Sequence, residues 1–301
     1  MKNMNKYENC LLCPRKCGIN RRTGQTGVCG VSSEIKVARA ALHYWEEPCI
    51  SGKRGSGAVF FSGCSLHCVF CQNREISDGK EGKVISKDRL SDIFMELEGK
   101  GANNINLVTP GQYIPDIVWA VNDAKSRGMK LPIIYNTSGY ENVTELKLLE
   151  GIVDVYLPDF KYMDSTLSAM YSRAKDYPSV AKQALSEMVR QQPDVVIDDA
   201  TGLIQKGVIV RQLLLPGHVN DAKAVLKYLY DTYHDHVYIS MMSQFTPIAL
   251  KDYPEINRTV TRREYERLVD YALEIGITNA FIQEGDVAKD SFIPAFDCEG
   301  V

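Results

Sequence analysis

Long apolar runs are absent from this sequence. The first twenty residues contain no apolar core of a signal peptide, and no later segment is apolar over the length needed to cross a bilayer. An excess of one charge is also absent, because 35 Lys and Arg residues face 38 Asp and Glu residues and the formal net charge is −3. Since the basic residues are scattered along the chain, we expect no nucleic-acid partner and no membrane association. Because the sequence shows neither a signal peptide nor a spanning segment, we expect a cytoplasmic protein.

Internal repeats, low-complexity tracts and flexible linkers are absent as well. A chain of 301 residues can bury a sizeable core, so it needs no disulfide staples. Its nine cysteines are better explained by metal than by disulfides, because the cytoplasm keeps thiols reduced. Cys49 and Cys298 stand apart and are interpreted as free thiols. The other seven form two groups: Cys10, Cys13, Cys17 and Cys29, then Cys64, Cys68 and Cys71.

The main part of the chain has the pattern of a parallel α/β fold. From about residue 58 onward, short apolar runs alternate with helical patterns, and the runs are apolar enough for strands covered on both faces. Six runs are predicted as strands: Ala58–Ser62, Ile105–Thr109, Pro132–Thr137, Val153–Leu157, Val208–Leu214 and Val237–Met241. The residues around Phe281 are candidates for a seventh. We predict a partial (β/α)6 barrel of parallel strands, with its chemistry on the loops that follow the strands.

Helix signals and a composition change complete the predicted organisation. Thr261 and Glu264 have the spacing of a capping box, which predicts a helix that starts there and ends at Gly276. An extra helix over Ser179–Gln191 and a hairpin over Pro193–Gly207 are predicted as an insertion before the fifth strand. Residues 1–57 are rich in Cys, Gly and Arg with few helical signals, so we predict a small N-terminal metal-binding lobe over 1–57 and the barrel over 58–301.

The second cysteine group follows a predicted strand directly, with the spacing C-x3-C-x2-C from Cys64 through Cys68 to Cys71. Thiolates are soft ligands that select iron–sulfur clusters or zinc. Three ligands on one loop can hold three corners of a cubane and leave its fourth iron open. A structural zinc site would need a fourth ligand, such as His67 or a distant residue.

This loop, with Phe70 just before its last cysteine, resembles the radical S-adenosylmethionine (SAM) superfamily, and the sequence is most similar to the pyruvate formate-lyase activating enzyme. The resemblance implies a [4Fe–4S] cluster on the catalytic cysteines Cys64, Cys68 and Cys71. It further implies that SAM binds the open iron and is cleaved reductively to a 5′-deoxyadenosyl radical, with electrons from a flavodoxin- or ferredoxin-type donor.

The same resemblance implies SAM-binding residues on the later loops. Thr109–Tyr113 lies where the family carries Gly-Gly-Glu, and Gln112 could replace the missing Glu. Asn136 stands where the activating enzymes have Asp, which removes a charge from the pocket. Asp159 and Lys161 match their Asp-x-Lys, in which the Lys can pair with the SAM carboxylate. Arg211, ahead of a Pro-Gly turn, is expected near the methionine end of SAM or near the substrate.

The first cysteine group supplies four thiols within twenty residues, among glycines that let the loop fold over a metal. It resembles the Cys-rich segment of a branch of activating-enzyme-like proteins. Structural zinc and an auxiliary [4Fe–4S] cluster both suit Cys10, Cys13, Cys17 and Cys29. The segment that follows, His43–Gly52, is interpreted as a packed linker, although its His43, Glu46 and Glu47 could reach the mouth of the site.

Two classes of function fit these motifs. The first is an enzyme that abstracts hydrogen from a protein glycine, thereby activating a glycyl-radical enzyme, or that modifies a small molecule or peptide. The second is a non-catalytic iron–sulfur module that relays electrons or binds a partner. Polar loops suited to SAM favour the enzyme, because a redox relay has no need of a Lys and an Asp for SAM. The sequence leaves the substrate unidentified.

Overall fold

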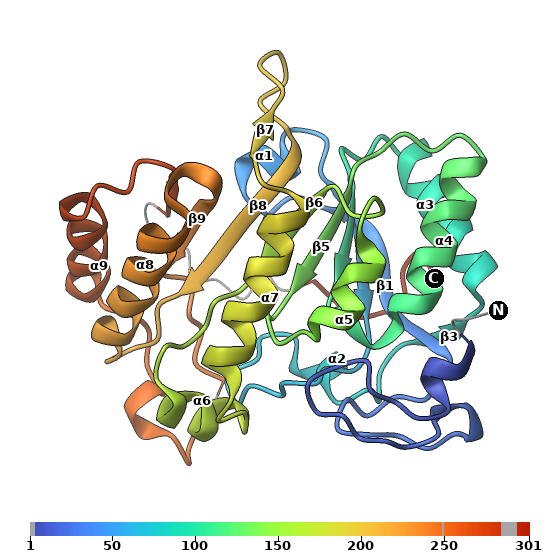
Figure 1. Ribbon diagram of the computed structural model, residues 1–301, viewed down its shortest axis with the longest axis horizontal. Helices are drawn as coiled ribbons and strands as arrows, with labels where there is room; N and C mark the ends of the chain where they lie inside the picture. Colours follow the sequence, from blue (N-terminus) through green and yellow to red (C-terminus); the bar gives the residue numbers. More distant parts are fainter. Residues whose placement is uncertain (1–3, 249, 284–293) are drawn as a thin grey trace.

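The chain is built around one ten-stranded sheet whose central strands are parallel. The computed structural model describes residues 4–248, 250–283 and 294–301. The strand order is β10-β9-β8-β6-β5-β4-β2-β1-β3, with β7 paired to β8 alone. Each pair from β2 to β10 along this order is parallel, whereas β1 pairs antiparallel with both β2 and β3. The sheet curves into the predicted partial barrel (Figure 1).

The parallel strands confirm the six predicted runs and the seventh around Phe281. Their residues are buried almost throughout in the middle of the sheet, because helices cover one face and the barrel interior the other. The strands are β2 (Ser56–Phe61), β4 (Ile105–Val108), β5 (Ile133–Thr137), β6 (Val155–Pro158), β8 (Ile204–Leu213), β9 (Tyr238–Met242) and β10 (Ala280–Ile282).

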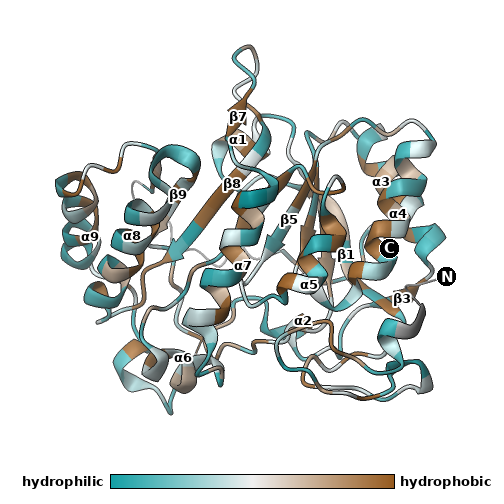
Figure 2. Cartoon of the chain, in the orientation of Figure 1, coloured by the Kyte–Doolittle hydropathy of each residue, from teal (hydrophilic) through white to brown (hydrophobic). Residues whose placement is uncertain are grey.

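Helices cover the outside of the sheet, with α3 beside α4, α5 beside α7 and α8 beside α9 (Figure 1). Their outer faces are hydrophilic and their inner faces join the hydrophobic core (Figure 2). Helix α9 begins at the predicted capping box, in which Thr261 and Glu264 bind each other's backbone. The helices are α1 (Pro48–Ser51), α2 (Arg74–Ser77), α3 (Lys87–Gly99), α4 (Ile114–Ser126), α5 (Val143–Leu146), α6 (Ser165–Ser172), α7 (Tyr177–Gln191), α8 (Val219–Tyr233) and α9 (Arg262–Glu274). None of them is long and apolar enough to span a bilayer.

The predicted insertion is present as α7 followed by a hairpin, in which β7 (Val196–Ile197) pairs antiparallel with the start of β8. Strands β1 (Ile35–His43) and β3 (Lys83–Ile85) were not predicted. Because β1 pairs along its length with β2, part of the predicted N-terminal segment 1–57 is a strand of the main sheet. The C-terminal residues run beside it, since Cys298 donates its N–H to Ala38 and Ala40 donates to Glu299.

The segment after β1 packs against the inner face of the curved sheet. Cys49 and Ile50 of α1 are buried and pack against side chains of β5, β6 and β8. Asn103 and Asn104, just before β4, donate side-chain hydrogen bonds to the carbonyls of Ser51 and Ile50. These contacts fix the segment inside the sheet and place Glu46 and Glu47 at the barrel interior.

Candidate active site

A cavity of about 230 Å³ lies at the carboxyl ends of the parallel strands. It joins the cysteine loop after β2 to the ends of β5, β6, β8 and β9, as the partial barrel predicts. The predicted residues that line it are Cys64, Cys68, Cys71, Asn136, Asp159, Lys161 and Arg211. His43, Trp45 and Glu46 also line it, and Trp45 is 58% exposed.

The cysteine loop is anchored in the core by its apolar residues. Leu66 is fully buried, and Phe70 packs between Tyr162, Tyr171 and Phe245. His67 takes the left-handed conformation (φ 52°) and donates from Nε2 to the Val28 carbonyl over 2.5 Å. The His67 ring therefore points toward the N-terminal lobe. It is not available as the fourth ligand of a zinc ion on the cysteine loop.

The three loop cysteines are partly buried, and the sulfurs of Cys64 and Cys68 accept hydrogen bonds. Ser172 Oγ donates to Cys68 Sγ over 3.1 Å, and the Leu66 N–H donates to Cys64 Sγ over 3.4 Å. Burial raises the pKa of all three thiols, to about 12 for Cys71. Unligated thiols in this cavity therefore stay protonated at neutral pH, and a metal must displace their protons to bind.

Lys161 and Asp159 form an ion pair after β6, with 2.5 Å between Nζ and Oδ2. Burial opposes the charge of Lys161, but the Asp159 carboxylate and the nearby Cys68 sulfur outweigh it and raise the pKa of the ammonium. Lys161 is thus a fixed cation beside the cysteine loop. Asn136 lines the same cavity from β5.

Arg211 of β8 is held by carboxylates that the sequence analysis did not pair with it. Its Nε donates to Glu47 Oε1 over 2.8 Å, and its Nη2 donates to Glu47 Oε2 over 2.5 Å and also to Glu46. Burial opposes both charges, but the pairing raises the pKa of Arg211 and lowers the pKa of Glu47. Arg211 therefore reaches the cavity as part of an acidic cluster.

Gln112 is the one predicted SAM contact that does not line this cavity. The chain turns into a 3-10 helix at Gly111–Tyr113 right after β4, which buries the Gln112 side chain. Its Nε2 donates to the carbonyls of Ser62, Gly63 and Thr109 at 2.9–3.1 Å. Gln112 ties the start of the cysteine loop to the loop after β4.

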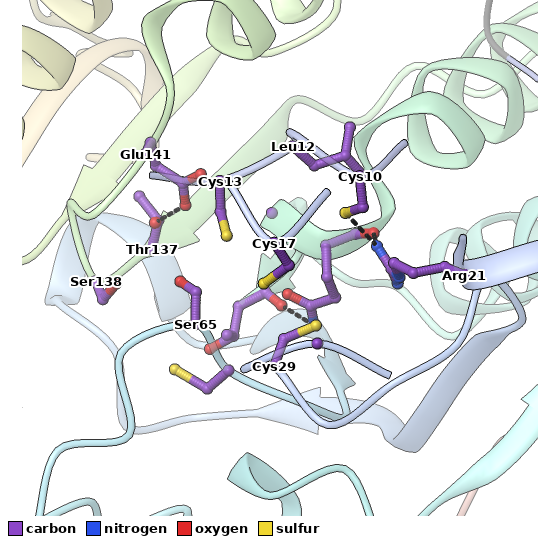
Figure 3. A pocket seen from close by; sticks show the side chains of 15 residues that line it. Cys10, Leu12, Cys13, Cys17, Arg21, Cys29, Ser65, Thr137, Ser138 and Glu141 are labelled. Carbon is purple, nitrogen blue, oxygen red and sulfur yellow. Dashed lines mark hydrogen bonds between the residues drawn. The ribbon is translucent and has the colours of Figure 1, made fainter. Parts of the chain in front are cut away.

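The N-terminal cysteines surround a second, small cavity of about 20 Å³ (Figure 3). Burial raises the pKa of Cys29, and that of Cys13 to about 12. Glu141 lines this cavity too; burial raises its pKa to about 7, and it accepts a hydrogen bond from Thr137. The lining thiols are Cys10, Cys13, Cys17 and Cys29, together with Cys64 of the other loop.

Arg21 is a buried cation beside these thiols that sequence reasoning missed. Its guanidinium donates to the carbonyls of Gln112, Ser32 and Val31 and lies 3.8 Å from Cys10 Sγ. In the described part of the chain no carboxylate forms an ion pair with it. A buried charge is costly without a counter-charge, so the thiol cluster is where that counter-charge is expected.

The lobe is fastened to the cysteine loop at two places. Arg15 donates to the carbonyls of Ser65, Ser172 and Arg173. Gly63 (φ 88°) lies so near the lobe that a Cβ there would stand 2.6 Å from the Cys29 carbonyl oxygen, so only glycine fits. The two cysteine groups are therefore neighbours.

The donor atoms at the two cysteine groups suit a soft metal, although their side chains do not converge on one point. Within residues 4–248, 250–283 and 294–301, no three His, Cys, Asp or Glu side chains stand in the geometry that holds a metal ion. Three thiols nevertheless line one cavity and five line the other, with Cys64 shared by both, and soft sulfur donors suit iron–sulfur clusters and zinc. Binding therefore needs rotation of the cysteine side chains toward a common centre.

A curved sheet of parallel strands with a three-cysteine loop after its first parallel strand is the fold predicted from the sequence, and comparison with known proteins supports this fold. Residues 51–173 match the 4Fe-4S single cluster domain family. The chain superposes on SuiB of Streptococcus suis bound to S-adenosylmethionine with a TM-score of 0.51 and 11% identity, covering 74% of this chain and 49% of SuiB. A second structure of SuiB gives a TM-score of 0.50 at 12% identity, covering 77% of this chain and 49% of that one.

The chain thus spans about half the length of these SuiB structures. In sequence it is 28% identical over 275 residues to the uncharacterized protein MJ0674 of Methanocaldococcus jannaschii, covering 89% of this chain and 75% of that protein. The α/β partial barrel and the 4Fe–4S domain that the sequence analysis predicted are therefore both confirmed.

Proposed function

We propose that this protein is a radical SAM enzyme that cleaves SAM reductively and uses the resulting 5′-deoxyadenosyl radical to abstract hydrogen. The observation that carries the proposal is the single cavity in which the three loop cysteines meet Lys161, Asp159 and Asn136 at the strand ends. A non-catalytic redox module would have no use for a buried lysine beside its cysteines.

The chain's own groups can hold each part of SAM. Cys64, Cys68 and Cys71 would ligate the cluster, which supplies the electron that breaks the S–C bond of SAM. The ammonium of Lys161 can bind the SAM carboxylate, and Asp159 keeps that ammonium in place and can accept from ribose hydroxyls. The buried walls of Phe60, Val108 and Leu66 keep water from the reacting atoms.

Anaerobic incubation with SAM and dithionite tests this activity. Protein reconstituted with about four irons per chain at the loop should release 5′-deoxyadenosine. A cluster-loaded protein that binds SAM and forms no 5′-deoxyadenosine would contradict the proposal.

We further propose that the protein works in the cytoplasm, where a flavodoxin- or ferredoxin-type protein supplies the electron that dithionite supplies in the experiment.

Replacing Lys161 by alanine is expected to weaken SAM binding by about ten- to a hundredfold, because a charged hydrogen bond is worth about 1.5–3 kcal/mol. Equilibrium titration of the cluster-loaded protein with SAM measures the change. The exposed Lys206 of β8 provides the control, since Lys206→Ala removes the same charge outside the cavity. Equal SAM affinity in Lys161→Ala and wild type would assign Lys161 a structural role.

The finer proposal is that the abstracted hydrogen belongs to a glycine of a partner protein, as in the activating enzymes that the sequence resembles. The match of Asp159 and Lys161 to their Asp-x-Lys supports it, whereas Asn136 departs from their pattern. Transfer of deuterium from α-deuterated glycine of a candidate partner into 5′-deoxyadenosine is the expected result. Deuterium arriving only from a small molecule or a non-glycine residue would replace this proposal with the alternative.

A second metal on Cys10, Cys13, Cys17 and Cys29 is the other finer proposal, as zinc or as an auxiliary [4Fe–4S] cluster. Four thiolates with a divalent charge at their centre carry net charge −2, which is opposite in sign to the buried cation of Arg21 and would supply its counter-charge. The burial of Arg21 without a paired carboxylate supports this assignment.

A further inference from the structure

The inner end of the active-site cavity carries more negative than positive charge. Glu46 and Glu47 share the single guanidinium of Arg211, and the side chains of all three are at most 11% exposed. Two carboxylates beside one guanidinium leave one negative charge that Arg211 does not neutralise. Such a charge is costly inside a protein unless a further cation comes close to it.

Asn106 extends this cluster and has an unused acceptor. Its Nδ2 donates to Glu46 Oε1 over 2.9 Å, while its Oδ1 is buried without a hydrogen-bond partner in the described part of the chain. Since side chains alternate along a strand, Asn106 lies on the same face of β4 as Val108, which lines the cavity. We name Glu46, Glu47, Arg211 and Asn106 the acidic floor.

His43, at the same end of the cavity, can also accept a hydrogen bond. His43 lines the cavity, and among the described residues no side chain or backbone group forms a hydrogen bond to its ring. Burial lowers the pKa of His43; the Glu46 carboxylate opposes this shift, Arg211 and Arg39 add to it, and the imidazole is neutral at pH 7. Glu46 and His43 line the cavity, and the Asn106 Oδ1, unpaired among the described residues, is buried next to Glu46, so acceptors gather around a negative charge, as a donor-rich cation requires.

We propose that the acidic floor binds a primary alkylammonium group of the substrate and thereby sets which substrates enter the cavity. The inference rests on the proposed radical SAM function and adds a substrate class to it. A carboxylate or phosphate substrate would face two carboxylates already paired to Arg211. The ammonium belongs to a free amine or to a lysine side chain, whose shared chemistry the floor recognises.

Binding without turnover tests the proposal on the reconstituted protein. With SAM present and no reductant, isothermal titration compares three capped tripeptides, Gly-Lys-Gly, Gly-norleucine-Gly and Gly-Glu-Gly, and the free diamine cadaverine. The wild type should bind the lysyl peptide, cadaverine or both about ten- to a hundredfold more tightly than the norleucine peptide. Whichever of the two binds more tightly identifies the source of the ammonium.

Glu46→Gln should remove most of this preference, and Glu46→Asp should restore part of it because it restores the charge. Glu274→Gln, at an exposed carboxylate at the end of α9, is the matched control and should keep the preference. A purely structural Glu46 would lower thermal stability in Glu46→Gln and leave the lysine-to-norleucine ratio unchanged, which overturns the proposal. A wild type that prefers the norleucine or glutamate peptide overturns it as well.

The radical SAM proposal and the ammonium-site proposal can be contradicted independently of each other. Absence of 5′-deoxyadenosine with dithionite removes the radical SAM function, whatever the peptides show. Release of 5′-deoxyadenosine, with neither the lysyl peptide nor cadaverine binding more tightly than the norleucine peptide, removes only the ammonium site.

Discussion

Replacing Cys68 by alanine is expected to abolish the release of 5′-deoxyadenosine from SAM. Three thiols on one loop leave no spare ligand for a [4Fe–4S] cluster, and His67 cannot take over because its ring is bound to Val28. The barrel should stay folded, since a single exchange of this size costs about 1–2 kcal/mol of a total of about 5–15 kcal/mol. Leu66 and Phe70 continue to hold the loop in the core.

Iron analysis and electron paramagnetic resonance measure this result. Wild-type protein should show a reduced [4Fe–4S] signal that changes when SAM is added, and Cys68→Ala should lose that signal. Cys298→Ala is the control, because Cys298 is a free thiol in the C-terminal segment beside β1. Persistence of SAM cleavage in Cys68→Ala would remove the radical SAM assignment.

The parallel strands could be predicted because their residues are buried on both faces and read as apolar runs. Strand β1 could not be, because Lys36 and Arg39 interrupt its pattern. Their charges are satisfied by groups from distant segments: Lys36 donates to the carbonyls of Gly79 and Lys80, and Arg39 pairs with Asp297 and Glu299. Such partners are brought together only by the folded chain.

The candidate site shows the same limit. Asn136, Asp159, Lys161 and Arg211 share a cavity because strand ends meet at one edge of a parallel sheet, which sequence position alone predicts. The partners of Arg211 were beyond prediction, since Glu46 and Glu47 stand 165 and 164 residues earlier in the chain. The position of the Gln112 side chain has a local cause, because the turn after β4 directs that side chain to backbone carbonyls.

Replacing Cys13 by alanine is expected to disorder the N-terminal lobe while the barrel survives. The apolar core of the lobe is small, with Tyr7, Cys10 and Leu12 packed beside Ile19. A structural zinc contributes about 10–16 kcal/mol, which is comparable with the stability of a whole domain. Loss of the metal also leaves Arg21 buried without a counter-charge, which adds to the destabilisation.

Metal analysis and limited proteolysis of Cys13→Ala measure this effect, with Cys298→Ala as the control. About one zinc and four irons per wild-type chain would make the lobe a structural zinc site, and about eight irons would make it an auxiliary cluster. In either case the variant should lose the lobe's metal and become cleavable between about residues 8 and 32. Wild-type metal content and protease resistance in the variant would mean that packing alone holds the lobe, through Arg15 and the close approach at Gly63. We favour a structural role, because four thiols fill every position of a tetrahedral site and leave none for a substrate.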